Sequence, residues 1–576
     1  MQKLLGDFWA SGLDESAIER DGANPIAPLL TRINAIKRAK EIPASIAALH
    51  QVGIPVVFHF GADVDLAELD RHIGYFSQGG LGLPDPAFYT RNDATSREVL
   101  SRYQDYIKRI LTLTGTPDKQ LATQTQHVVD LETRIARAAR PLSELHDPRR
   151  NYVSVPVADL GKKFKRLQLA EFLKAQGVND DRVSMANAEL FTQLDGMLGN
   201  FKPEQWKTYL RWRVGDTMAP YLSRPWREAH FDFNGRLLQG QEQAPDRQQQ
   251  ALDAINLAAG PMLSREYVAR FLPATTRSRA EEISAKVRDA LGTAIERDPR
   301  LGAEAKTEAK TKLAQLKIEV GAPRRDLDYT VQPMGRGSFG SNMLIASSWR
   351  HREEMKRIGR GNADRRWDVL PQQPALTYDL AQNRLIVSAA ILQPPVLDMS
   401  QSLASQYGSL GALVGHELSH AFDQRGRMVD AKNEVRDWWS ATDSAAWTAL
   451  GNRVAAQYSS LPYPQLSGVR VNGERVRDVA VADLAGVELA TAAMQSALPK
   501  IGKPEQQALY QGWAQLWPQQ WGVEVATEHA ASSAHAPGQW RTNATLMNQP
   551  GFATAFGCKA GTAMQLKTDQ QIALWR

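Results

Sequence analysis

The pentapeptide HELSH, residues 416–420, carries the side chains whose types and spacing most directly indicate chemistry. On a helix, positions i and i+4 share a face, so His416 and His420 can present two imidazole nitrogens to one metal ion. Glu417, one residue further round, can then act as general base on a water molecule that zinc activates. The alternative is an amphipathic helix whose histidines are held by ordinary hydrogen bonds. The spacing predicts a zinc site, and the surrounding sequence must distinguish the two.

The segments around the pentapeptide predict the elements that position it. SLGALVGHELSHAFD, residues 409–423, is expected to form a buried helix. RLIVSAAILQPP, residues 384–395, is a β-branched apolar run ended by two prolines, which predicts a strand ahead of that helix. Further elements are expected downstream, namely helices around residues 441–457, 478–496 and 504–517 and a loop rich in small residues near 530–545.

The first part of the chain has a mostly helical pattern. Apolar residues recur at three- and four-residue spacing in residues 96–115 and 119–140, which predicts two amphipathic helices. Residues 278–320 continue the pattern as a helical pair broken near Pro299. The character of the sequence changes after this pair, so we expect a boundary near residue 325 between a helical first part and a second part that contains the candidate site.

Length and charge limit the classes of protein to consider. A chain of 576 residues exceeds the size at which one hydrophobic core usually stops growing, so two domains are expected. The formal net charge is +6, but the densest basic stretch, residues 351–366, also contains Glu353, Glu354 and Asp364. Such mixed charge is typical of a solvated face, so we expect no nucleic-acid partner.

Disulfide and membrane signals are absent from the sequence as given. The single cysteine, Cys558, cannot form a disulfide within this chain. No apolar run approaches the roughly 18 residues that a membrane span requires. The first 20 residues also lack the basic start and apolar middle of a signal peptide. We therefore expect no membrane span in this chain.

HELSHAFDQRGRMVDAKNEVRDWW, residues 416–439, resembles the zinc-helix segment of neprilysin-family metallopeptidases, the group that includes the endothelin-converting enzymes and bacterial oligopeptidases. Further segments resemble family signatures in family order: QGGLGLP (78–84), AAILQPP (389–395), ADLAGVELA (482–490), HAPGQWR (535–541) and AFGCKAG (555–561). Matches spread over most of the chain exclude a helical scaffold whose motifs are accidental. By resemblance the chain is identified as a member of this family.

The resemblance implies a fold and an activity. It implies a mainly α fold with a small β-sheet, in which a thermolysin-like (gluzincin) catalytic domain and a large helical capping domain enclose a cavity. We accordingly expect residues 1–325 to form the capping domain and residues 326–576 the catalytic domain. The implied activity is that of a zinc-dependent metalloendopeptidase acting on short peptides, with one zinc ion. The sequence indicates neither the natural substrate nor the oligomeric state.

The resemblance also bears on the start of the chain and on its location. Relatives carry a membrane anchor or export signal and then a further segment before the point that matches Met1, so we expect the chain to start late. The missing segment can also hold the cysteine that partners the one matching Cys558. An extracytoplasmic location, periplasmic or secreted, is implied if such an export segment precedes this chain.

Beyond the zinc histidines His416 and His420 and the base Glu417, three positions match residues with known family roles. Asp483 matches the aspartate that orients a zinc histidine. His535 matches the histidine that stabilises the oxyanion, and Arg541 matches the arginine that binds the substrate backbone. Their structural alternatives are a local cap or pair for Asp483 and ordinary loop positions for the other two.

Three departures separate this sequence from the family pattern. The glutamate that supplies the third zinc ligand, in a pattern close to ENIADLAG, is replaced by Val479 in VAVADLAG, and the neighbouring asparagine by Ala480. The substrate-binding asparagine and alanine of a strand close to VNAYY are Ala375 and Leu376, so the asparagine's side-chain bonds are lost while main-chain pairing can survive. Ser533 stands where many relatives have an aspartate.

A valine cannot bind zinc, and three residues are candidates to replace the ligand. Asp478 points about 100° away round the helix, Asp483 would have to abandon its histidine, and His529 lies at an unknown position in a loop. Two hypotheses follow. The first is a working zinc peptidase with a substitute ligand or a weakly held metal. The second is a catalytically impaired pseudo-peptidase that binds peptides or a partner.

Overall fold

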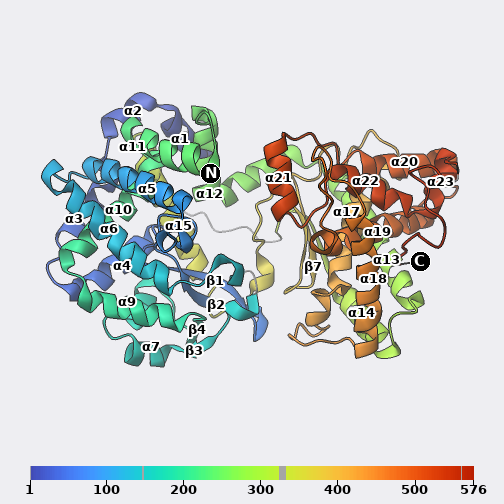
Figure 1. Cartoon of the computed structure of the whole chain (residues 1–576), viewed down its shortest axis with the longest axis horizontal. Coiled ribbons are helices and arrows are strands. Elements are labelled where there is room, and N and C mark those ends of the chain that lie inside the picture. Colours follow the sequence, from blue (N-terminus) through green and yellow to red (C-terminus); the bar gives the residue numbers. More distant parts are fainter. Residues whose placement is uncertain (1, 146–147, 324–332, 560, 576) are drawn as a thin grey trace. The chain divides into compact units, whose positions relative to one another are not determined.

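The computed structural model describes residues 2–145, 148–323, 333–559 and 561–575 and confirms a mainly α fold (Figure 1). The chain forms two compact units. The first unit comprises Met1–Leu66, Asp70–Leu263 and Leu327–Ala363, and the second comprises Ala67–Leu69, Ser264–Asp326 and Asp364–Arg576. Each unit has its own hydrophobic core.

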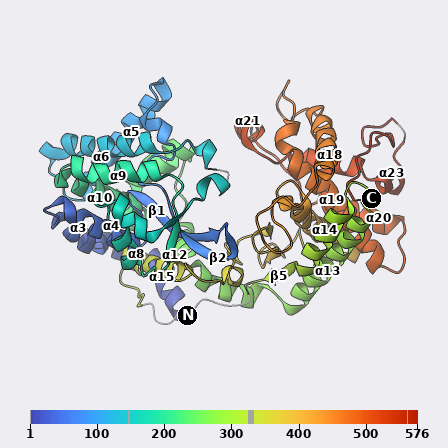
Figure 2. The same cartoon turned by 90° about the horizontal axis from the view of Figure 1, so that it is seen from below.

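These units differ from the single division expected near residue 325. Helices α13 (Ala274–Arg297) and α14 (Ala303–Gln315) precede that point, yet they belong to the second unit. The reason is packing and strand pairing: α13 contacts α19 (Gly473–Ala497), and β5 (Lys317–Gly321) pairs in parallel with β7 (Arg384–Ser388). Figure 2 shows α13, α14 and β5 close together. The expected break near Pro299 lies between α13 and α14, as predicted.

The first unit is largely helical. The helices predicted at residues 96–115 and 119–140 are confirmed as α5 (Ala94–Leu113) and α6 (Asp118–Ala138), which pack on each other and on α10 (Pro203–Met218). The other helices of this unit are α1 (Gln2–Leu13), α2 (Glu15–Asp21), α3 (Ala27–Asn34), α4 (Ile42–Gln51), α7 (Val157–Lys163), α8 (Leu169–Gln176), α9 (Ala188–Asn200), α11 (Arg224–His230) and α15 (Phe339–Met355), and α12 (Arg247–Phe271) continues into the second unit.

This unit also contains a sheet that the sequence analysis missed. Its order is β1-β2-β4-β3, formed by β1 (Phe58–Asp65), β2 (Glu68–Gln78), β4 (Arg182–Ser184) and β3 (Ser154–Pro156). Phe58 and Phe60 are buried on either side of exposed His59, which is the period-two pattern of a half-buried strand. The signal was therefore present, but only over a few residues between long helical segments.

The second unit holds the HELSH helix. Its sheet has the order β5-β7-β6, with β6 (Leu376–Asp379) antiparallel to β7 and on the edge of the sheet. HELSH itself lies in α17 (Ala412–Ser419) and the short 3-10 turn His420–Phe422 that follows. The remaining helices are α16 (Leu403–Gln406), α18 (Ala441–Ser459), α19, α20 (Lys503–Ala514), α21 (Val523–Ser532), α22 (Gly538–Met547) and α23 (Pro550–Phe556).

Helix α19 forms the centre of this unit and contacts α13, α17, α18 and α22. A pair of glycines allows α17 and α19 to approach closely. A Cβ on Gly415 would lie 3.0 Å from Gly486 Cα, and a Cβ on Gly486 would lie 2.3 Å from the carbonyl oxygen of Ala412. The two backbones therefore touch at the level of the HELSH histidines.

One predicted element in this unit is wrong. The loop expected near residues 530–545 is instead the end of α21, a short connection and most of α22. Small residues such as Ala530 and Ala544 are compatible with helix, and the latter is buried in the core. Composition alone therefore could not distinguish a loop from a tightly packed helix.

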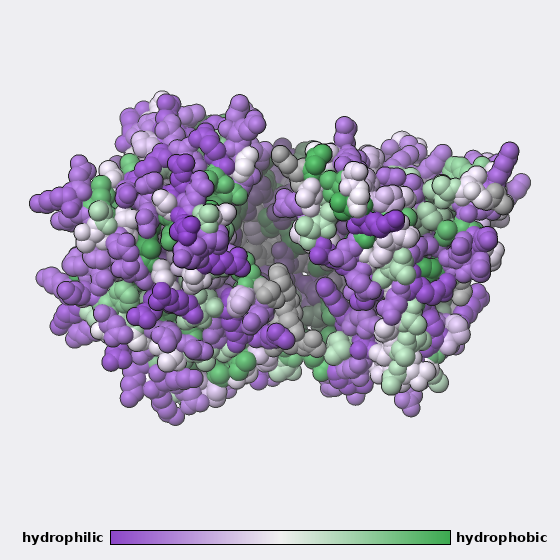
Figure 3. Space-filling model, viewed as in Figure 1, coloured by the Kyte–Doolittle hydropathy of each residue, from purple (hydrophilic) through white to green (hydrophobic). Residues whose placement is uncertain are grey.

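On the face shown in Figure 3, hydrophilic side chains cover most of the surface and apolar residues occur in scattered groups. Among the described residues, no helix is both long enough and apolar enough to cross a membrane.

Candidate metal centre

His416, Glu417 and His420 come together as the sequence spacing predicts. One potential ligand atom from each lies within 4.8 Å of the others. The two imidazole rings are perpendicular, with centroids 5.0 Å apart. Among the described residues, this is the one group of three or more His, Cys, Asp or Glu side chains with a spacing suited to a metal ion.

Asp483 orients the first histidine. Its Oδ1 lies 2.8 Å from His416 Nδ1, and both groups are buried. Arg541 donates two further hydrogen bonds to the same carboxylate, from Nε to Oδ2 at 2.8 Å and from Nη2 to Oδ1 at 2.6 Å. Burial raises the pKa of Asp483, but the charge and bonds of Arg541 and the bond to His416 outweigh it and hold the pKa at about 2. Asp483 is therefore a carboxylate, and His416 Nε2 is left for a ligand.

Asp423 orients the second histidine, and the sequence analysis missed it. Its Oδ2 lies 2.7 Å from His420 Nδ1. Burial lowers the pKa of His420, but the bond to Asp423 and the negative charges of Asp423 and Glu417 together raise it above its ordinary value. The available signal was the spacing HAFD, which places a carboxylate three residues after the second histidine. Both Nδ1 atoms are thus held by carboxylates, which leaves the Nε2 atom of each ring available to a ligand.

Glu417 is bound to the edge strand β6. Its Oε2 accepts a hydrogen bond from the main-chain N–H of Tyr378 at 2.9 Å. That N–H therefore points away from β7 and toward α17. Main-chain groups two residues apart point to the same side of a strand, so those of Leu376 also face this free edge. Ala375 is instead tied to β7, because its carbonyl accepts from Ser388 N–H at 2.9 Å and its N–H donates to Ser388 Oγ at 2.9 Å.

Val479 lies half-buried one turn before Asp483 in α19. None of the three candidates for a substitute ligand joins the group of His416, Glu417 and His420 whose ligand atoms lie within 4.8 Å of one another. Asp478 is exposed and pairs with Arg477 at 2.9 Å, and His529 Nδ1 lies 2.8 Å from the Tyr463 hydroxyl. Asp483 is already bound to a histidine and an arginine. In the described chain, the cluster itself contains no ligand from α19.

Arg541 and His535 lie near this centre on the segment around α22. The Arg541 guanidinium lies 3.6 Å from the centroid of the half-buried Trp517 ring, a contact that the sequence analysis missed. His535 is exposed, and its main-chain N–H donates to Ser533 Oγ at 3.0 Å. Partial burial and then the positive charge of Arg541 lower the pKa of His535, so the ring is a neutral donor at neutral pH. Ser533 thus bonds to the main chain of residue 535.

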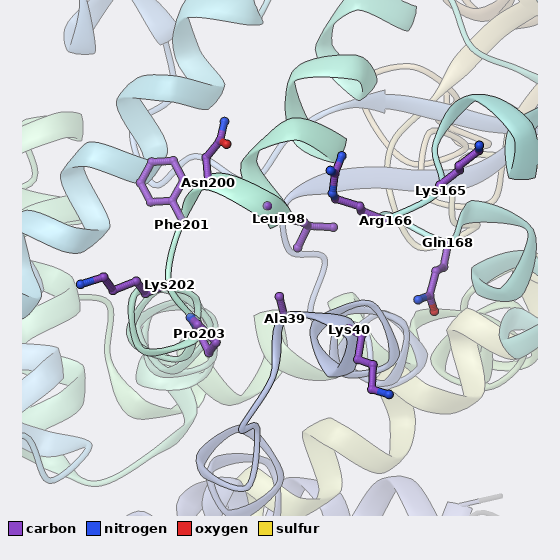
Figure 4. Close-up of a pocket in the computed structure, with 11 residues that line it drawn as sticks. Ala39, Lys40, Lys165, Arg166, Gln168, Leu198, Asn200, Phe201, Lys202 and Pro203 are labelled. Carbon is purple, nitrogen blue, oxygen red and sulfur yellow. The ribbon is translucent and has the colours of Figure 1, made fainter.

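A cavity of about 540 Å³ lies in the first unit and offers no comparable centre. Its lining includes four cationic side chains and no carboxylate or histidine. The charged ends of these side chains point in different directions rather than toward a common point (Figure 4). They are Lys40, Lys165, Arg166 and Lys202.

Comparison with known proteins identifies the family. Two family models described as peptidase family M13 match residues 1–323 and 377–572, which together are most of the chain. The chain belongs to peptidase family M13. Relatives include the neutral endopeptidase of Lactobacillus helveticus, 24% identical over 98% of this chain and 86% of that protein. Mouse neprilysin is 23% identical over 97% of this chain and 80% of its own length.

Solved structures of M13 relatives share the fold. A cryo-EM structure of the Mycobacterium tuberculosis zinc metalloprotease Zmp1 in an open state has a TM-score of 0.88 and 26% identity, covering 99% of this chain and 90% of that one. PepO from Lactobacillus rhamnosis has a TM-score of 0.82 at 20% identity, with 99% and 90% coverage. Membership of the neprilysin-like zinc metallopeptidases, expected from the motifs, is thereby confirmed.

The donor set has the residue types that the zinc ion implied by the M13 family requires. Two imidazole Nε2 atoms with both Nδ1 atoms held by carboxylates, and a third carboxylate within 4.8 Å, have the chemistry of a zinc site. The set is short of one ligand if Glu417 is to remain free as a base, because residue 479 is a valine. The residues therefore fit a zinc ion, with fewer protein ligands than the three of a usual catalytic site.

Proposed function

We propose that this M13 protein hydrolyses peptide bonds in short peptides as a zinc-dependent metalloendopeptidase. His416 and His420 would hold the ion through their Nε2 atoms, and Glu417 would act as general base. The observation that carries the proposal is the pair of carboxylate–histidine contacts, Asp483–His416 at 2.8 Å and Asp423–His420 at 2.7 Å. A metal-binding histidine usually donates its other ring N–H to such a partner, and here each of the two histidines has one.

Zinc, when bound, would supply Lewis-acid activation of water and of the peptide carbonyl. Glu417 would accept the proton from the attacking water. Its bond to Tyr378 N–H supports this role, because it fixes Oε2 at the strand edge close to the two imidazoles.

The free edge of β6 is the proposed place for the substrate main chain. An extended peptide adding to this edge would pair with the main-chain groups of Leu376 in the manner of an extra strand. Ala375, which turns toward β7, would contribute no side-chain hydrogen bond. Substrate binding should therefore depend on backbone pairing more than on a side-chain clamp.

His535 and Arg541 are proposed to act on the substrate carbonyls. His535 is exposed and neutral at neutral pH, so it can donate a hydrogen bond to a developing oxyanion. Arg541 is held by Asp483 and by the face of Trp517, and two of its five N–H donors bind Asp483. Its remaining donors would bind the substrate backbone. By family resemblance, an extracytoplasmic location, periplasmic or secreted, belongs to the same proposal if an export segment precedes this chain.

A second candidate function is favoured by Val479. In the described residues no carboxylate or imidazole of α19 joins the HELSH cluster. If two histidines hold zinc too weakly, the protein would keep the M13 fold and bind peptides or a partner without hydrolysing them. Glu417 separates the two candidates, because it can serve as base or as third ligand but not as both.

The deciding experiment measures zinc and cleavage in the same preparations. We expect zinc at about one ion per chain after brief dialysis and chelator-sensitive cleavage of a quenched fluorescent peptide. Glu417→Gln should lower kcat by about 10²- to 10⁴-fold with unchanged zinc affinity if Glu417 is the base. Loss of zinc binding in Glu417→Gln would instead assign it as a ligand. A wild-type chain that retains no zinc and cleaves no peptide would support the second candidate.

A further inference from the structure

Lys312 in α14 has a fully buried side chain. Its ammonium group donates three hydrogen bonds to main-chain carbonyls, to Ala421 at 3.0 Å, Gly426 at 2.7 Å and Val429 at 2.8 Å. An ammonium group has three N–H donors, so all of them are used. The charge of Lys312 is thus bound entirely by the segment 421–429, which directly follows the HELSH helix.

Burial of this charged group is unfavourable, and it changes the pKa of Lys312. Burial lowers the pKa of Lys312 to about 7, opposed by the negative charges of Asp423, Asp430 and Glu308. An apolar side chain of similar length would avoid the desolvation of a charged group. Lysine at this position therefore indicates that segment 421–429 requires three strong donors at one point.

Segment 421–429 carries the carboxylate that orients His420. Asp423 Oδ2 lies 2.7 Å from His420 Nδ1, and its Oδ1 accepts from the main-chain N–H groups of Arg425 at 2.8 Å and Gly426 at 2.9 Å. The segment folds back on the helix end so closely that a Cβ on Gly426 would lie 2.2 Å from the carbonyl carbon of Ala421. Lys312 binds carbonyls on both sides of Asp423 and so fixes where that carboxylate lies.

The main chain of Lys312 is linked to Glu417 by a second route. Its carbonyl accepts from Asn383 Nδ2 at 2.7 Å, and Asn383 Oδ1 accepts from the Tyr378 hydroxyl at 2.9 Å. The N–H of Tyr378 then donates to Glu417 Oε2 at 2.9 Å. One residue of α14 therefore supports two members of the HELSH cluster through separate chains of contacts.

We propose that Lys312 is a positioning residue of the metal centre, which holds segment 421–429 so that Asp423 keeps the His420 ring directed at the metal. This inference rests on the proposed zinc site. The competing explanation is that Lys312 only stabilises the fold. Trp438 Nε1 also donates to two of the same carbonyls, Gly426 at 3.3 Å and Val429 at 3.2 Å, so these two carbonyls have a donor besides Lys312. Lys312 adds the bond to Ala421, next to the metal ligand.

The test compares Lys312→Met with Lys310→Met, the same change at an exposed position of the same helix. Zinc dissociation constants come from competition with a chromophoric chelator, and hydrogen exchange is followed in the peptide covering residues 421–438. Loss of a partner that orients a metal-binding histidine typically costs about 10- to 100-fold in affinity. We expect about a tenfold weaker zinc complex and faster exchange confined to this peptide for Lys312→Met, and neither change for Lys310→Met.

A double variant distinguishes positioning from general stability. Because Lys312 acts through Asp423, adding Lys312→Met to Asp423→Asn should weaken zinc binding little beyond Asp423→Asn alone. Additive losses, or faster exchange spread evenly over the second unit, would overturn the proposal. If Lys312→Met is not recovered folded, Lys312→Gln, which keeps two N–H donors, takes its place in the same measurements. Absence of zinc from the wild-type chain would reject the proposed function, while the exchange comparison would still decide the role of Lys312 in holding this segment.

Discussion

Asp483 binds His416 and Arg541 with the same carboxylate: Oδ1 lies 2.8 Å from His416 Nδ1 and 2.6 Å from Arg541 Nη2. The residue that matches the family's histidine-orienting aspartate is thus also the anchor of the proposed substrate-binding arginine. In Asp483→Asn the amide cannot satisfy both partners, which leaves a buried guanidinium incompletely paired. We expect a loss of about 3 kcal/mol in the free energy of unfolding and about 10- to 100-fold in zinc affinity, measured by denaturation and chelator competition.

The matched control is Asp478→Asn, on the exposed face of the same helix. It should change the free energy of unfolding by less than about 0.5 kcal/mol and leave zinc affinity unaltered. A clear fall in zinc affinity for Asp478→Asn would show that Asp478 acts as the substitute ligand after all.

Val479→Glu should restore the missing third ligand. Position 479 lies one turn before Asp483 on the same face of α19, so a glutamate there can reach toward the HELSH cluster. We expect zinc affinity to rise by on the order of tenfold or more, with a parallel rise in kcat/KM on a quenched fluorescent peptide. Val479→Gln, of similar size but neutral, should reproduce neither gain. Tighter zinc without more activity would show that the substrate groups are also impaired.

Ala375→Asn should improve substrate binding, because it returns a side chain that can donate and accept hydrogen bonds beside the free edge of β6. One or two added bonds are worth about 0.5–1.5 kcal/mol, so KM should fall about two- to tenfold with kcat little changed. Ala375→Leu controls for size without polar groups. An unchanged KM in Ala375→Asn would place the substrate elsewhere than this edge.

Gly486→Ala should separate α17 from α19. Its Cβ would lie 2.3 Å from the carbonyl oxygen of Ala412, and backbone atoms cannot move aside as a flexible side chain can. We expect a loss of about 2 kcal/mol or more in the free energy of unfolding and weaker zinc binding, because the Asp483–His416 contact depends on this approach. Gly196→Ala is the control: it lies in α9 with nothing within 4 Å of the new Cβ. It should stabilise by about 0.5–1 kcal/mol.

Acid should destabilise the first unit through His50. This histidine is buried between Phe58 and Phe172, and burial lowers its pKa to about 3. Between that value and the ordinary value of about 6.5, the unfolded chain binds one more proton than the folded chain, so stability falls as pH falls through this window. The slope should be on the order of 1 kcal/mol per pH unit. Denaturation from pH 7 to pH 4 should show a shallower slope in His50→Gln, and equal slopes would contradict the assignment.

Sequence periodicity predicted some elements well and others poorly. Helices α5 and α6 and the break near Pro299 follow from three- and four-residue spacing sustained over many residues. Strands β1 and β2 and helix α22 were missed because their burial depends on what packs against them rather than on a regular apolar spacing. The strand pairing of β5 with β7 crosses the expected boundary near residue 325, and no local pattern reports such a pairing.

In the candidate site, too, some features follow from the sequence and others only from the tertiary structure. By itself the sequence determined that His416, Glu417 and His420 share one helical turn and that position 479 is a valine, because both are properties of spacing and residue type. Only the tertiary structure decided that Asp483 holds the Nδ1 atom of His416 and that the main chain of Tyr378 anchors Glu417. The Asp483–His416 and Tyr378–Glu417 contacts join residues distant in the chain, and the first lies where Gly415 and Gly486 let two helix backbones meet. Long-range packing of this kind leaves no periodic trace in the sequence.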